Sequence, residues 1–213
     1  VHDRRLLASI YWVKGDIADK VGDIYECVDF FERALGLFQE EQDALAVARA
    51  VGQLATCVMK CGIVSFTILE RTLSWVVRVR GAHLGDSNTS SAMYLSIYEA
   101  NLRLKMGQYL ESVELLDAVV RDCYLPDDVL AWVHLTYALC EIGSGNVERA
   151  RWFLGNARAL LESSSEREEG KFLLRLLGHT YIDLGDVQVG LAMLDQYTTE
   201  PSDFSWCIPV VAT

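Results

Sequence analysis

Apolar residues recur along the chain with helical spacing, in segments that a short repeated turn separates. Between residues 94 and 106 the apolar positions follow intervals of one to four residues, and similar spacing resumes from 110 to 120. Each segment predicts an amphipathic helix with one face toward a core. The turn between these two helices centres on Gly107, because glycine readily takes the left-handed conformation that ends a helix.

The same turn pattern occurs five times: a glycine, a small, polar or apolar residue and then an apolar residue, with a helical segment on either side. The glycines stand at positions 22, 62, 107, 145 and 185, so successive glycines are 40, 45, 38 and 40 residues apart. A near-constant period of this size is typical of stacked helical repeats. The five turns are Gly22-Asp23-Ile24, Gly62-Ile63-Val64, Gly107-Gln108-Tyr109, Gly145-Asn146-Val147 and Gly185-Asp186-Val187.

Each repeat is predicted to be two antiparallel helices. One such pair cannot bury both of its faces alone, so the pairs must stack, which predicts an all-α fold. One repeat domain is expected over residues 1–197, and Gly81–Ser91 is expected to be its longest loop. The predicted units are about 1–40, 41–81, 91–124, 126–162 and 165–197, followed by an irregular tail at 198–213.

The composition argues for a folded chain and against several classes of partner. Hydrophobic residues make up 51% and charged residues 23%, and only three prolines interrupt the helical segments. The net charge of −11 would repel the phosphates of nucleic acids, so no direct nucleic-acid partner is expected. No apolar run is long enough to span a bilayer, so no membrane partner is expected either.

The six cysteines are better explained as buried free thiols than as a disulfide framework, because a chain of this size can bury a core without cross-links. Free thiols predict an intracellular location in a reducing compartment, the cytoplasm or the nucleus. Cys57 and Cys61 share a helix face and could form half of a zinc site. No second pair has ligand spacing, so we interpret them as core residues and expect no metal or cofactor.

The five units resemble the tetratricopeptide repeat (TPR), which places small residues where its helices cross. The last unit is the most similar, with Leu177-Gly178, Tyr181, Gly185-Asp186 and Gly190. The second unit departs from the pattern, since Thr67, Arg71 and Ser74 stand where small and aromatic residues belong. The resemblance implies a right-handed α-α superhelix, a solenoid of about five helix pairs, that binds a protein or peptide.

In the TPR family the first helix of each pair lines the concave face, so the resemblance implies where a partner would bind. The corresponding positions combine aromatic, basic and amide side chains, which suit recognition of a peptide. For Tyr94, Tyr98 and Trp132, ordinary packing between helices is an equally good interpretation. The implied binding residues are Trp12, Asp16, Arg49, Gln53, Tyr94, Tyr98, Asn101, Lys105, Trp132, Arg175 and His179.

Motifs that carry catalysis are absent from the sequence: it has no phosphate-binding G-x-x-x-x-G-K-[ST], no H-E-x-x-H and no G-x-S-x-G. The chain is therefore expected not to be an enzyme. The leading hypothesis is an interaction scaffold, a domain or subunit of a larger assembly. The alternative is a sensor domain of a signalling or transcriptional regulator that binds a small molecule or short peptide. The apolar tail segment Trp206–Val211 is expected either to cap the last repeat or to mediate self-association.

Overall fold

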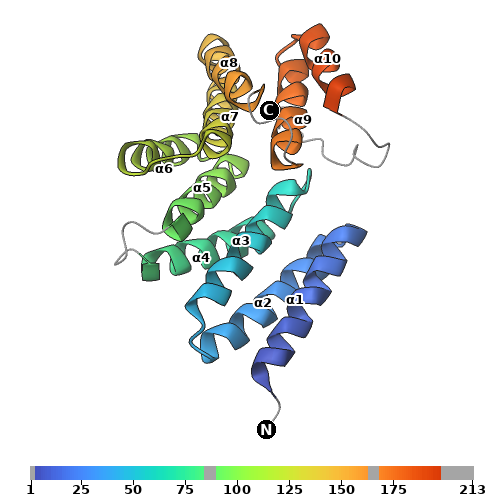
Figure 1. Ribbon diagram of the computed structural model, residues 1–213, viewed down its shortest axis with the longest axis vertical. Coiled ribbons are helices and arrows are strands. Elements are labelled where there is room, and N and C mark those ends of the chain that lie inside the picture. Colours follow the sequence, from blue (N-terminus) through green and yellow to red (C-terminus); the bar gives the residue numbers. More distant parts are fainter. Residues whose placement is uncertain (1–2, 84–89, 163–167, 198–213) are drawn as a thin grey trace. The chain divides into compact units, whose positions relative to one another are not determined.

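The structure, a computed structural model, describes residues 3–83, 90–162 and 168–197 (Figure 1). Within these segments the chain forms ten α-helices and no strand, which confirms the all-α helical-repeat fold. None of the described helices combines the length and apolar character that crossing a bilayer requires. The helices are α1 (Arg4–Val21), α2 (Ile24–Glu40), α3 (Ala44–Lys60), α4 (Phe66–His83), α5 (Ser90–Lys105), α6 (Tyr109–Asp122), α7 (Asp127–Gly143), α8 (Val147–Glu162), α9 (Glu168–Asp183) and α10 (Val187–Tyr197).

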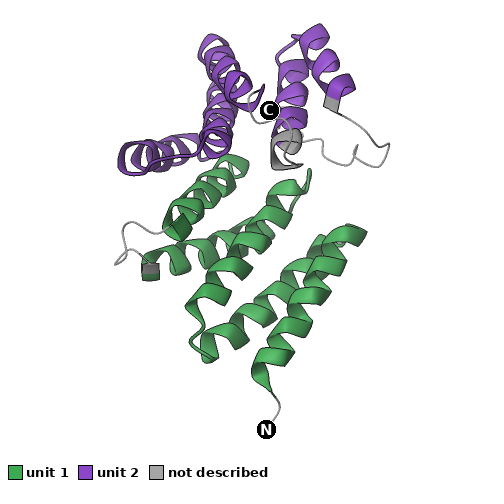
Figure 2. Cartoon of the chain, in the orientation of Figure 1, with its two compact units in different colours: residues 1–106 green, residues 107–213 purple. Residues whose placement is uncertain are grey.

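The chain divides into two compact units, Val1–Met106 with α1 to α5 and Gly107–Thr213 with α6 to α10 (Figure 2). In unit 1, α1 packs along α2 as an antiparallel pair, and α2, α3, α4 and α5 follow in contact (Figure 1). In unit 2, α7 pairs with α8 and α9 with α10. A single repeat domain over residues 1–197 stays a prediction, and the tail 198–213 lies outside the described residues.

The first repeated turn shows why glycine followed by a polar residue joins two helices. Gly22 has a φ of 83°, a left-handed conformation that favours glycine. The backbone N–H of Asp23 donates to the carbonyl of Ala18 at 2.9 Å, which satisfies the end of α1. Asp23 then begins α2, because its Oδ1 accepts from the N–H of Glu26 at 3.0 Å. Left-handed glycines also stand at Gly107, Gly145 and Gly185.

The second predicted turn has a different structure. Residues 61–65 form a longer connection between α3 and α4, with Gly62 inside it. The two residues after Gly62 are β-branched and carry no oxygen that could cap a helix. The start of α4 therefore moves to the residue after Ser65, whose Oγ accepts from the N–H of Ile68 at 3.4 Å.

The prediction of a loop over Gly81–Ser91 was wrong at both edges. The helix α4 continues through Gly81 to His83, and α5 already begins at Ser90. An interior glycine costs a helix only about 1 kcal/mol relative to alanine, and burial of Val76 and Val79 on the same helix can outweigh that cost. Residues 84–89 lie outside the described part of the chain.

Small residues lie where paired helices approach most closely. A Cβ atom on Gly15 of α1 would lie 2.9 Å from ring carbons of the buried Phe31 on α2. A Cβ atom on Gly190 of α10 would lie 2.4 Å from the carbonyl oxygen of Gly178 on α9. Glycine at these positions therefore sets the distance between the helices of a pair.

Candidate partner-binding face

The predicted binding residues of unit 1 lie on α1, α3 and α5, and packing brings those of α3 and α5 together. The two helices are in contact. They approach closely at Gly52, where a Cβ atom would lie 3.3 Å from Cε2 of Tyr98. The Tyr98 ring therefore covers α3 next to Gln53, which is half-buried, and one turn from Arg49, which is exposed. We call the surface formed by Arg49, Gln53, Tyr98, Asn101 and Lys105 the α3–α5 face.

Lys105 brings a positive charge to the C-terminal end of α3. Its Nζ donates a hydrogen bond to the carbonyl oxygen of Cys61 at 2.5 Å. A cation is favourable there because the last carbonyl groups of a helix carry partial negative charge. Burial lowers the pKa of Lys105 to about 8, and the nearby Cys61 thiol works in the opposite direction. The ammonium group is therefore mostly protonated at neutral pH.

One polar side chain of this face and one beside it are held against their own helices. The Nδ2 atom of Asn101 donates to the carbonyl of Ile97 at 2.9 Å. The hydroxyl of Thr56 donates to the carbonyl of Gly52 at 2.9 Å. Such bonds to the preceding turn fix the side chains at the helix surface. The α3–α5 face is thus polar and ordered around the Tyr98 ring.

Of the predicted binding residues on α1, Trp12 packs against the neighbouring helix α2. The Trp12 ring lies edge-on to Phe31 and Phe38 of α2, with centroid distances of 5.9 and 6.2 Å. Aromatic pairs at this distance and angle stabilise a core. Trp12 therefore packs against the core of unit 1, while Asp16 on the same helix is half-buried. Tyr94, at the start of α5, is 36% exposed.

The predicted binding residues of unit 2 lie on α7 and α9, and these two helices are in contact. Trp132 of α7 packs partly buried against the core of this unit. On α9, Arg175 and His179 are half-buried. Burial raises the pKa of Asp183, one turn after His179, and the histidine partly offsets that shift. The two residues are four positions apart and so lie on one face of α9.

The buried carboxylate of Glu99 on α5 was not predicted from the sequence. Glu99 is only 1% exposed, yet it accepts from Arg80 of α4 at 2.7 Å and from Arg103 of α5 at 2.9 Å. Its spacing of four residues from Arg103 is visible in the sequence, but its partner on α4 is not. The two arginines compensate the buried charge and fix α5 against α4.

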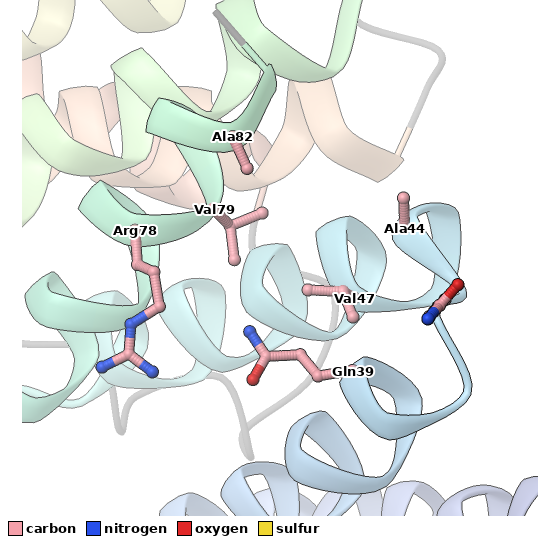
Figure 3. A pocket seen from close by; sticks show the side chains of 7 residues that line it. Gln39, Ala44, Val47, Arg78, Val79 and Ala82 are labelled. Carbon is pink, nitrogen blue, oxygen red and sulfur yellow. The ribbon is translucent and has the colours of Figure 1, made fainter.

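The structure also has a hollow away from the α3–α5 face, where α2 ends, α3 begins and α4 ends (Figure 3). Its volume of about 200 Å³ is smaller than the roughly 300–1,000 Å³ of typical small-molecule sites. Side chains of α4 face those of α2 and α3 across it (Figure 3). The hollow is lined by Gln39, Gln42, Ala44, Val47, Arg78, Val79 and Ala82.

Comparison with known proteins identifies the kind of fold. Residues 8–41, which cover most of α1 and α2, match the model of the Tetratricopeptide repeat family. A Rap protein complexed with Competence and Sporulation Factor superposes with a TM-score of 0.68 at 11% identity, over 89% of this chain and 52% of the Rap protein. The chain thus spans about half the length of that protein.

A second solved structure is similar over nearly the whole of both chains. It is a kinesin light chain-like protein of Podosopora anserina with nearly identical TPR-like repeats, and its TM-score is 0.62 at 19% identity. The superposition covers 92% of this chain and 95% of that one. No curated protein sequence matches the chain. The family match and the two structures show that this chain has a TPR-like helical-repeat fold.

Proposed function

We propose that the chain is a non-catalytic interaction scaffold that binds a peptide or protein segment on the α3–α5 face. The close packing of Tyr98 on Gly52 is the observation that carries this proposal, because it sets an aromatic ring beside Gln53 and Arg49. The fold supports it, since stacked helical repeats present extended surfaces for binding. A Rap protein with this fold was solved with Competence and Sporulation Factor bound.

The charges on this face favour a segment that carries carboxylate groups. Arg49 lies near the start of α3, and Lys105 lies at its end, beside Cys61. Position 61 comes twelve positions after position 49, and α3 runs through Lys60 between them. The distance along the helix axis is therefore roughly 18 Å at 1.5 Å per residue. An extended peptide of about five residues covers this distance. We therefore propose an acidic peptide of at least this length as the ligand.

Selection from a random peptide library, with the immobilised chain as bait, tests the proposal. Synthetic versions of the selected peptides are then titrated by fluorescence anisotropy. Arg49→Glu should weaken their binding about tenfold or more, because the variant replaces an attractive charge with a repulsive one. The control variant Glu70→Arg changes an exposed charge on α4 by two units in the opposite direction and should leave the Kd within about twofold.

Two results would count against this function. One is a selection that enriches no peptide above an uncoated surface. The other is a set of peptides whose affinity responds equally to Arg49→Glu and Glu70→Arg, which would place their site elsewhere. Circular dichroism of both variants should show that the fold is retained, because both positions are exposed.

A further inference from the structure

Three side chains that can bind a metal ion meet inside unit 1 from three different helices. Asp19 lies in the last turn of α1, Cys27 in the first turn of α2 and Cys57 in the last turn of α3. A carboxylate oxygen of Asp19 and the two Sγ atoms all lie within 4.8 Å of one another. Both cysteines are fully buried and Asp19 is half-buried.

The donor atoms suit a thiophilic divalent cation. Zn²⁺ binds thiolate sulfur at about 2.3 Å and carboxylate oxygen at about 2.0–2.2 Å. Ligand atoms around such a tetrahedral centre are therefore roughly 3.3–3.8 Å apart. Small side-chain rotations would bring Asp19, Cys27 and Cys57 to these separations. Two sulfur donors favour Zn²⁺ or a similar soft ion over Mg²⁺ and Ca²⁺, which prefer oxygen ligands.

A fourth donor stands one helical turn beyond Cys57. Cys61 is the residue that follows α3, four positions after Cys57. The backbone N–H of Cys61 donates to the carbonyl of Cys57 at 3.2 Å, so the helical spacing from Cys57 continues to Cys61. Its half-buried position at the end of α3 leaves it room to turn toward the cluster.

We propose that Asp19, Cys27, Cys57 and Cys61 bind one Zn²⁺-like ion, which joins α1, α2 and α3. Each of the three thiols exchanges its S–H bond for a metal–sulfur bond, so one ion displaces three protons to solvent. No electron is transferred in this exchange. The ion would cross-link the first helix pair to α3 at the same end of α3 that Lys105 contacts. This inference does not rest on peptide binding at the α3–α5 face.

Cobalt binding to the full chain tests the site, because Co²⁺ in a tetrahedral thiolate site gives visible and near-ultraviolet absorption bands. The chain is kept reduced with a phosphine and titrated with Co²⁺, and then with Zn²⁺ as a competitor. One equivalent of Co²⁺ should saturate the bands, and one equivalent of Zn²⁺ should remove them. A pH indicator should report three released protons per ion, and Zn²⁺ should raise the melting temperature.

Variants distinguish this site from other cysteines. Cys27→Ser and Cys57→Ser should abolish the thiolate bands, and Asp19→Asn should weaken Co²⁺ binding at least tenfold. Cys61→Ser should reduce the proton release from three to two. The matched control is Cys140→Ser, which removes a buried thiol of unit 2 that contacts Ser112 at 3.4 Å.

The control should keep one equivalent of Co²⁺ and its bands. Because Asp19 is half-buried, Asp19→Asn tests the site even where a buried cysteine variant fails to fold, which circular dichroism reports. The absence of thiolate bands in the wild-type chain overturns the proposal. Bands that persist in Cys27→Ser, a Co²⁺ affinity that is unchanged in Asp19→Asn, or bands that disappear in Cys140→Ser also overturn it.

Discussion

Packing in unit 2 changes the acid–base behaviour of a single side chain, the imidazole of His134. Its ring lies beside Trp152 and Phe153 of α8, with centroid distances of 6.3 and 5.8 Å. Its Nδ1 atom is buried and has no hydrogen-bond partner among the described residues. Burial accordingly lowers the pKa of His134, because the charged imidazolium would lose its hydration.

This lowered pKa predicts a loss of stability in mild acid. In the unfolded chain a histidine has a pKa of about 6.5. Below that pH the His134 imidazole therefore binds a proton more readily in the unfolded state than in the folded state. Stability consequently falls as pH decreases. The free energy of unfolding should drop between pH 7.5 and pH 5.5, by up to about 1.4 kcal/mol per pH unit below 6.5. Urea titrations of the wild type and His134→Leu measure the effect. An equal drop in both proteins would contradict this explanation.

At the scale of helices, local sequence explains most of the fold. Glycine followed by a capping residue predicts where α1 ends and α2 begins, because both signals act on the adjacent backbone. The same rule failed at Gly62, where no capping oxygen follows the glycine. The α4–α5 connection was also predicted too long, because α4 continues through Gly81 to His83 and α5 begins at Ser90.

The candidate site was less predictable, because its contacts join residues that are distant in sequence. The TPR resemblance placed Tyr98 and Lys105 on the first helix of their pair, but it could not show that Tyr98 lies on Gly52. Nor could it show that Lys105 reaches the carbonyl of Cys61, 44 residues earlier. The sequence paired Cys57 with Cys61 by spacing alone, whereas the fold brings Cys57 to Cys27.

Helix crossings predict opposite effects for two glycine-to-alanine substitutions in unit 2. Gly190→Ala places a Cβ atom 2.4 Å from the carbonyl oxygen of Gly178, so α9 and α10 must separate, at a cost of about 2–3 kcal/mol. Gly155→Ala in α8 meets no atom within 4 Å and should stabilise the chain by up to about 1 kcal/mol through helix propensity. Denaturant titrations of the two variants compare them directly. A Gly190→Ala variant as stable as the wild type would contradict the proposed close approach.

At the scale of the whole molecule, each of the two compact units has its own hydrophobic core. The core of unit 1 runs from Ala8 to Leu102, and that of unit 2 from Ala131 to Met193. Within unit 1, α5 contributes buried residues to this core and also the carboxylate of Glu99 that pairs with Arg80. The last helix of unit 1 is thus integral to its stability.

The fragment Val1–Met106 is therefore expected to fold by itself. It should show helical circular dichroism and a cooperative urea transition, because the core of unit 1 and its buried ion pair lie entirely within it. A matched fragment of residues 1–83 lacks α5 and so loses Leu95 and Leu102, each of which contributes about 1.5–3 kcal/mol when fully buried. It also leaves Arg80 without Glu99, so its transition should be much weaker or absent. Equal stability of the two fragments would show that α5 does not stabilise unit 1. A disordered longer fragment would show that unit 1 does not fold by itself.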